Sequence, residues 1–115
     1  MDALFNQSGG VYAWLDTATG NIVSLSGQHL AFIDGDSVYN WQGQHIGWWQ
    51  DGHIRDRVGA VALFTDVAGS LGVVKPVRAV KPVQPVKAVS PVRPVKAVKP
   101  VRSVKQLAWS TSLPF

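Results

Sequence analysis

The sequence predicts an all-β protein in which four pseudo-symmetric β-hairpin repeats of about 16 residues form a compact ring, followed by a Pro-rich extended tail. Two observations predict the ring. Apolar strand-like runs alternate with short Gly-containing loops, and Gly27, Gly43 and Gly59 stand sixteen residues apart. A triplet pattern that starts at Val74 predicts the tail. Repeats of this kind indicate units that share one core, because none can bury its own apolar face.

Each predicted unit is a strand, a turn containing Gly, and a second strand. A glycine in such a loop supplies the positive φ that tight hairpin turns need. The looser turn at 16–20 absorbs the two extra residues that separate the first unit from the second. The four units are 4–15 around Gly9, 22–33 around Gly27, 38–49 around Gly43 and 54–64 around Gly59.

One face of the second strands is apolar in every unit. The residue five places after each glycine is aromatic, and the residue two places earlier lies on the same face of a strand. We predict that this face is the core. We also predict that the mostly small residues between the two core positions of each unit crowd together near the axis of the ring. The core positions are Trp14, Phe32, Trp48, Phe64, Tyr12, Leu30, Ile46 and Ala62, and the positions between are Ala13, Ala31, Gly47 and Leu63.

The repeated strand, x-Gly, strand and Asp-Gly turn resembles the bacterial 4-fold beta-flower domain, most clearly in the stretch GQHIGWWQDGHIRD at 43–56. The resemblance covers about residues 3–70, and the basic tail resembles tails that often follow that domain. It implies a pseudo-fourfold all-β fold and no established activity. We therefore assign 3–70 to the β-flower domain, 71–106 to the triplet tail and 107–115 to an aromatic C-terminal segment.

Charge divides the chain into two parts. Before residue 70 there are seven Asp and two Arg, a net charge of −5, whereas the rest has nine Lys or Arg and no acid. The two parts should attract each other within the Debye length of about 8 Å. The absence of Cys excludes disulfides. The chain shows no signal peptide and no apolar run of membrane-spanning length, which predicts a cytoplasmic protein and no membrane partner.

The tail repeats in threes. Valine occupies every third position from Val74 to Val104, and Leu107 continues the phase. A base usually follows each valine, and the third place is Pro or Ala except at Ser103, with the alanines nine residues apart. A period of three is that of polyproline II. The valine stripe predicts burial, because a solvated arm has no need of it; the alternative is a disordered basic linker.

We expect the tail to dock on the head face opposite the predicted core, with valines in grooves and bases reaching Asp turns or aromatic rings. A straight tail would extend about 96 Å, so it must bend round the ring, project outward or cross sister subunits. Trp109 is the predicted anchor, with a frayed terminus as the alternative. The predicted docking face is Val23, Leu25, Ile33, Tyr39, Trp41 and Trp49.

Little in the sequence indicates chemistry. His29 and His45 are equivalent, but the other two units have Val there, so no metal site is expected. The Asp-Gly-Asp stretch at 34–36 lacks the closing Glu of a calcium loop and reads as a turn. A nucleophile with its base and a pair of acid and base carboxylates are not recognisable. The sequence predicts neither an enzyme nor a cofactor.

The predicted function is a non-enzymatic structural or protein-interaction module whose tail docks on its own ring, on sister subunits of a homo-oligomer, or on another protein. The alternative is a basic-tailed, nonspecific binder of nucleic acid or another polyanion. Nine bases could neutralise phosphates, and aromatic side chains of the head could stack on exposed bases.

Overall fold

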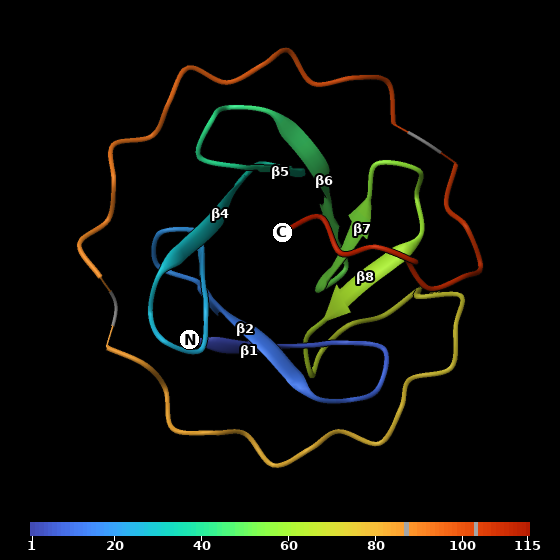
Figure 1. Cartoon of the computed structure of the whole chain (residues 1–115). Helices are drawn as coiled ribbons and strands as arrows, with labels where there is room; N and C mark the ends of the chain where they lie inside the picture. Colours follow the sequence, from blue (N-terminus) through green and yellow to red (C-terminus); the bar gives the residue numbers. More distant parts are fainter. Residues whose placement is uncertain (87, 103) are drawn as a thin grey trace.

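Eight antiparallel strands, each paired with its chain neighbours, close into a barrel of four hairpins in the computed structural model (Figure 1). The structure describes residues 1–86, 88–102 and 104–115; Lys87 and Ser103 of the triplet tail lie outside the described residues. The all-β prediction is confirmed. No helix that could cross a membrane occurs among the described residues. The strands are β1 (Asp2–Phe5), β2 (Val11–Asp16), β3 (Asn21–Val23), β4 (His29–Asp34), β5 (Ser37–Tyr39), β6 (His45–Gln50), β7 (His53–Asp56) and β8 (Val61–Phe64).

The four hairpins repeat the same irregularity. In each hairpin, the pairing register between the two strands shifts just before the last paired residue of the first strand. These last paired residues are Phe5, Val23, Tyr39 and Arg55. A bulge of this kind increases local twist and bends the strand. Short, strongly twisted hairpins can therefore close on one another, and closure leaves no strand edge unpaired.

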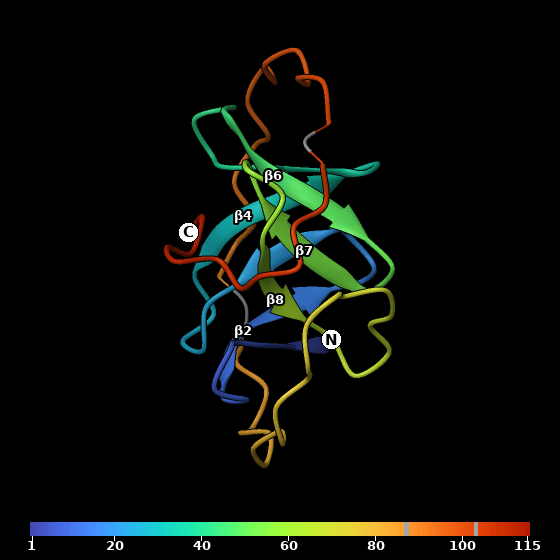
Figure 2. The same ribbon diagram turned by 90° about the vertical axis from the view of Figure 1, so that its right-hand side faces the viewer.

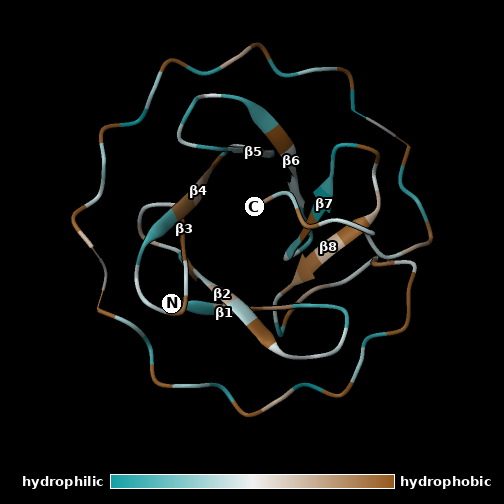
Figure 3. Ribbon diagram, in the orientation of Figure 1, coloured by the Kyte–Doolittle hydropathy of each residue, from teal (hydrophilic) through white to brown (hydrophobic). Residues whose placement is uncertain are grey.

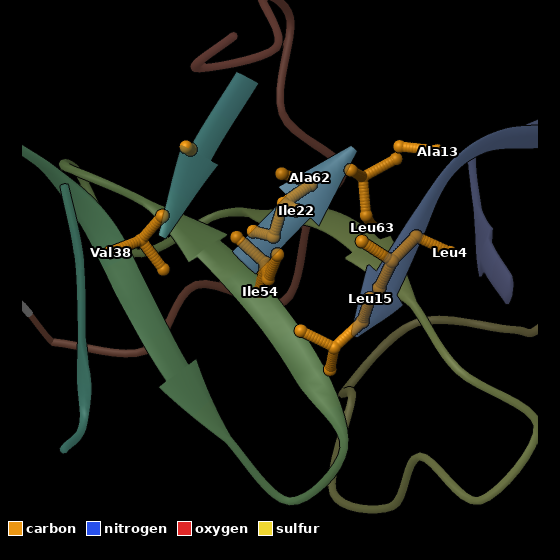
Figure 4. Packing of buried hydrophobic residues seen from close by; sticks show 9 residues of the cluster. Leu4, Ala13, Leu15, Ile22, Val38, Ile54, Ala62 and Leu63 are labelled. Atoms are coloured by element: carbon orange, nitrogen blue, oxygen red, sulfur yellow. The ribbon is translucent and has the colours of Figure 1, made fainter. Parts of the chain in front are cut away.

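Three of the four residues predicted to lie between the core positions, Ala13, Ala31 and Leu63, belong to the cluster at the barrel axis. The axial cluster consists of Leu4, Ala13, Leu15, Ile22, Ala31, Val38, Ile54, Ala62 and Leu63 (Figure 4). Small side chains fill the narrow interior of a closed sheet. At Gly47, a Cβ would press on the backbone carbonyl of Arg55.

The predicted core face is therefore partly wrong. Trp14, Phe32, Trp48 and Phe64 are all buried, but Phe32 and Trp48 face side chains of the tail, and Trp14 and Phe64 belong to a second cluster with Leu71. These large aromatic side chains lie outside the axial cluster, because the interior of a small closed barrel is narrow. Of the other predicted core positions, Ala62 is buried in the axial cluster, and Tyr12, Leu30 and Ile46 are partly buried against it.

The tail bends round the ring. It circles the whole barrel (Figure 1) and, seen edge-on, stays near the circumference (Figure 2) of a molecule measuring 37 × 36 × 22 Å. We call residues 74–106 the belt. The chain then returns to the centre, where Leu113 and Phe115 pack against the axial cluster and the Tyr12 hydroxyl donates to the Phe115 carbonyl at 2.5 Å.

The valines of the belt face outward, so the prediction that they fill grooves in the ring is wrong. These valine residues are 86–97% exposed, and hydrophobic residues recur at the outward bends of the belt (Figure 3). The reason is that the other two sides of the triplet are directed inward. Backbone groups of the Ala positions bind the ring, and the basic side chains reach its aromatic and Asp residues.

Candidate functional site

Four backbone hydrogen bonds attach the belt to the ring, one for each hairpin. The N–H groups of Ala79, Ala88, Ala97 and Gln106 donate to the carbonyls of Gly9, Gly27, Gly43 and Gly59, at 2.8, 3.0, 2.9 and 3.0 Å. Nine residues of the belt therefore span the distance from one hairpin to the next. Proline has no N–H and cannot serve as the donor. The alanines recur every nine residues because a donor is needed there, while proline is tolerated at the triplets between.

The contact with the belt also explains why glycine recurs once in each hairpin. Gly43 has φ +85°, and its backbone lies so close to the belt that a Cβ would overlap the carbonyl oxygen of Val95. A Cβ at Gly9 or Gly59 would likewise overlap the carbonyl of Val77 or Val104. Glycine therefore does two things here: it allows the left-handed turn conformation, and it lets a second backbone approach.

Moving one donor by a single triplet should loosen the belt. The double variant Ala97→Pro/Pro100→Ala keeps the composition and the triplet pattern, but it removes the N–H that binds Gly43. We expect the free energy of unfolding to fall by about 1–2 kcal/mol. The Gly43 carbonyl loses its hydrogen-bond donor, and the pyrrolidine ring of the new proline is forced against Gly43. Chemical denaturation measures this. The single variant Pro100→Ala is the control and should change stability by less than about 0.5 kcal/mol; equal stability of the double variant and the wild type would contradict the proposed register.

Basic belt side chains cover the outer aromatic rings. The Arg93 guanidinium lies 4.5 Å from the centre of the Phe32 ring and also donates to the Thr19 carbonyl, and Arg102 lies 5.0 Å from the Trp48 ring. Belt cations also form ion pairs with head carboxylates. These pairs are Arg78 and Lys81 with Asp66, Lys96 with Asp34, and Lys99 and Arg102 with Asp36.

The ion pairs contribute less than the backbone contacts. Their side chains are 37–52% exposed, and exposed pairs of this kind are each worth about 0–1 kcal/mol and weaken with salt. They steer the basic tail onto the acidic ring. The register itself comes from the glycine carbonyls and the stacked rings, since these require one particular residue at each place.

A buried arginine joins the two ends of the belt. Arg55 is 2% exposed and stands where the other units have Phe5, Val23 and Tyr39. Its guanidinium donates to the carbonyls of Gly59 at 2.6 Å, Gln106 at 2.9 Å, Leu71 at 2.9 Å and Ser70 at 3.3 Å. The carbonyls of Ser70 and Leu71 lie just before the belt begins and that of Gln106 is at its last residue, so this one side chain binds the chain on both sides of the belt. We call it the clasp. Arg55 is not among the predicted site residues, although a charge at an otherwise apolar repeat position was a signal.

The clasp requires a neutral histidine. His53 is fully buried, and its Nε2 accepts a hydrogen bond from Arg55 Nε at 3.2 Å, so the proton is on Nδ1 near the Asp51 carbonyl. Burial lowers the pKa of His53 below its ordinary value of 6.5, and the Arg55 charge acts in the same direction. Burial also lowers the pKa of His45.

Stability should therefore fall as the pH drops below about 6.5. Below that pH, His53 binds a proton in the unfolded chain but stays neutral in the folded one. The free energy of unfolding therefore falls by up to about 1.4 kcal/mol per pH unit for each such histidine. Above pH 6.5 the full stability is present. Urea unfolding at pH 7.5, 6.5, 5.5 and 5.0 measures the slope, and this range lies above the titration of Asp36 and Asp66, whose pKa values are lowered by hydrogen bonds from Lys99 and Lys81. His53→Gln should reduce the slope without abolishing it, because His45 remains. An unchanged slope would show that His53 is not the group responsible.

A family model described as 4-fold beta flower protein matches residues 2–114. The chain belongs to this family. The match extends beyond the 3–70 ring and includes the belt and most of the C-terminal segment of this beta flower. Searches of curated proteins and of solved structures found no match. The description of the family names an architecture and no activity.

The six residues predicted as a docking face lie in different places in the beta flower. Val23 and Tyr39 pair with Trp14 and Phe32, so they share the outer face, where the Tyr39 hydroxyl donates to the Ala97 carbonyl at 3.4 Å. Trp41 packs on Phe32, whereas Leu25 is about half exposed. Ile33 and Trp49 instead pack against the axial cluster. The six do not form one face, because the prediction took the outer aromatic face for the core.

Trp109 contacts the ring directly. It forms a parallel bridge with Val61, in which Val61 N–H donates to the Ala108 carbonyl at 2.9 Å and Ser110 N–H donates to the Val61 carbonyl at 2.7 Å. Its indole packs at 5.8 Å from the Phe64 ring. The segment that covers the barrel axis, however, is the end of the chain, through Leu113 and Phe115.

The equivalent histidines have different surroundings. His29 Nε2 lies 2.9 Å from the Ala88 carbonyl, whereas the buried nitrogens of His45 have no hydrogen-bond partner among the described residues. Within the described part of the chain, no group of three His, Cys, Asp or Glu side chains is placed to hold a metal ion. The polar groups assembled around the ring bind polypeptide backbone, so the arrangement is suited to holding a peptide segment.

Proposed function

We propose that this beta flower is a non-enzymatic structural or protein-interaction module in which the tail acts as a belt that holds the four hairpins together. One observation carries the proposal: the N–H donors of the belt recur every nine residues and meet the equivalent glycine carbonyl of each successive hairpin. A tail that served only as a flexible linker would not need alanine or glutamine, in place of proline, at those four positions.

The charge distribution favours the belt over the nucleic-acid alternative. Five of the basic side chains of the belt pair with carboxylates of the ring, and Arg93 covers Phe32. A polyanion would have to displace these contacts and then lie against an acidic ring. The same belt contacts could also be made with the ring of a second copy, so the experiment must separate an intramolecular belt from an exchanged one.

Trypsin provides the test because of where its sites fall. The enzyme cleaves after Lys and Arg but poorly before Pro, so the susceptible bonds include 78–79, 96–97 and 105–106, each adjoining a hydrogen-bonded donor. We expect these bonds to resist cleavage for at least tenfold longer than in the urea-unfolded chain, with tail fragments identified by mass spectrometry. The exposed turn at Arg57 serves as an internal control for active protease. Rapid cleavage at all three bonds would reject the docked belt.

Two further measurements separate the alternatives. Protection that is independent of protein concentration, together with a monomeric mass by sedimentation, supports an intramolecular belt; a dimer with protected bonds indicates exchange between copies. A fluorescent single-stranded DNA is then titrated at 20 mM and 150 mM salt. DNA binding at both salt concentrations, accompanied by loss of trypsin protection, would favour the polyanion-binding function instead.

A further inference from the structure

Most of the large apolar residues exposed in the described part of this protein are the valines of the belt. They occupy every third position from Val74 to Val104, and none of them belongs to either apolar cluster of the ring among the residues described. The backbone contacts and basic side chains that hold the belt do not use the valine side chains. Scattered apolar residues are normal on a protein surface, but a long continuous set marks an interaction surface.

The valines form a continuous surface rather than isolated points. Prolines at intervening positions of the belt are also exposed, as at Pro82, Pro91 and Pro100. The belt circles the barrel, and hydrophobic residues recur along it (Figures 1 and 3). We call this outward side of residues 74–104 the rim. A neighbour that approaches from any direction perpendicular to the barrel axis therefore meets apolar side chains.

The basic side chains between the valines are directed away from the rim. Five of them pair with carboxylates of the ring, and the Arg93 guanidinium lies 4.5 Å from the centre of the Phe32 ring. Charges that would make two rims repel each other are therefore balanced within each copy. A surface that binds anionic lipids has the opposite arrangement, with free bases beside its apolar residues. The rim is thus better suited to an apolar protein surface than to a membrane or a nucleic acid.

The spacing of the valines is matched by the belt of a second copy. An extended triplet repeat rises about 3.1 Å per residue, so successive valines lie about 9 Å apart along the belt. A valine inserted midway between two others lies about 4.6 Å from each, which is close to the contact distance of apolar side chains. A partner that fits the rim must carry apolar side chains at this same spacing, and another belt necessarily does.

One contact between two rims is small. The protein measures 37 × 36 × 22 Å, so two rims curve away from each other and about three valines of each can meet. The buried area stays below the roughly 1,200 Å² of stable complexes, which predicts a Kd of about 1 mM for one contact. Each copy keeps the rest of its rim free, however, so further copies can join and the assembly does not close at two.

We propose that the rim is a surface for lateral self-association, in which copies of this chain lie side by side and the valines of neighbouring belts interdigitate. The rim depends on the docked belt of the proposed function, because an undocked tail presents no such surface. Lateral association differs from exchange of belts between copies. In an exchange the ion pairs would form between chains, and salt would weaken the association.

Sedimentation equilibrium of the full chain between 20 µM and 1 mM tests the rim. The protein should be monomeric at 20 µM, and its weight-average mass should rise about 1.5-fold or more by 1 mM in 300 mM NaCl, as a Kd of about 1 mM requires. Association should be weaker in 20 mM NaCl, because the net charge of +4 on each copy is then less screened. It should also be weaker at 5 °C than at 25 °C, because hydrophobic association weakens on cooling.

Two variants with eight substitutions each separate apolar contact from the stiffness of the belt. Val→Thr keeps the β-branched shape that favours an extended backbone but adds a hydroxyl, so the variant should stay monomeric at 1 mM and keep its trypsin protection. Val→Ile keeps the branched shape and adds a methylene, so it should lower the Kd at least threefold. The substituted positions are Val80, Val83, Val86, Val89, Val92, Val95, Val98 and Val101.

Trypsin protection distinguishes failure of the rim from failure of the belt. A wild-type protein that keeps its protection but stays monomeric at 1 mM would overturn the rim and leave the belt in place. Equal association of the threonine and isoleucine variants, or association that weakens as salt is raised, would also overturn the rim. Loss of trypsin protection in the wild type would reject the docked belt, and the rim with it.

Discussion

Removing residues 73–115 is expected to lower the melting temperature of the protein by about 15 °C or more and to cause aggregation on heating. Without the belt and the C-terminal segment, the ring loses its four backbone contacts at the glycines and the cover over its outer aromatic residues. Burial of a large apolar side chain is worth about 1.5–3 kcal/mol, so partial uncovering of several costs several kcal/mol in a domain whose total stability is small. Differential scanning calorimetry with light scattering measures both effects.

A peptide added in trans provides the control for the truncation. A synthetic peptide of residues 73–115 should restore part of the lost melting temperature to the truncated ring. The same peptide with Pro in place of Ala79, Ala88 and Ala97 should restore much less, because it lacks the N–H groups that bind the glycines. If the truncated ring melts like the intact chain, the belt does not stabilise the ring and the proposed function is wrong.

Replacing Arg55 with methionine is expected to lower the free energy of unfolding by about 3 kcal/mol, the largest effect of any single substitution considered for this chain. Methionine fills similar volume but donates no hydrogen bond, so four carbonyls lose a charged donor. Hydrogen bonds to charged groups are worth about 1.5–3 kcal/mol each, and release of the buried charge offsets part of that loss. Urea unfolding at pH 7.5 gives the value.

Two variants test whether the clasp depends on the geometry of arginine. Arg55→Lys keeps the charge but not the fork, so it should recover less than half of the loss. Arg57→Met removes an exposed arginine two residues away and should change stability by about 0.5 kcal/mol or less. The Arg55 variants should also open the belt at its ends, which trypsin cleavage at the 105–106 bond would report. A stable Arg55→Met protein would show that the ends are held by other groups.

The clasp has a structural reason beyond its own hydrogen bonds. A belt of about thirty residues must give up much backbone freedom to lie round the ring, at about 1–2 kcal/mol per fixed residue. Contacts spaced nine residues apart offset that cost only if both ends are held, since a belt with a free end can fray from one glycine to the next. Arg55 prevents this because one buried side chain binds the chain just before the belt, at Leu71, and at the last belt residue, Gln106.

Repetition made the ring predictable from the sequence. The Gly spacing and the alternation of apolar residues around each glycine predicted four hairpins, and the hairpins formed by β1 to β8 begin and end within about two residues of the predicted units. Both signals are local, because a turn and a strand depend on neighbours in the chain. The acidic ring and the basic tail likewise predicted their attraction, and ion pairs such as Lys99 with Asp36 form where Asp turns meet the belt.

The sequence alone also determined that the tail repeats in threes, with alanine every nine residues, but it did not determine which side faces the ring. Only the tertiary structure decided that the valines turn outward, that Phe32 and Trp48 lie outside the axial cluster, and that Arg55 is a clasp. The physical reason is that each of these depends on the path of a second segment across the ring. A period of three leaves open which of the three sides of the tail, valine, base or Pro/Ala, faces the ring. Hydrogen bonds to glycine carbonyls far away in the sequence decide which side does.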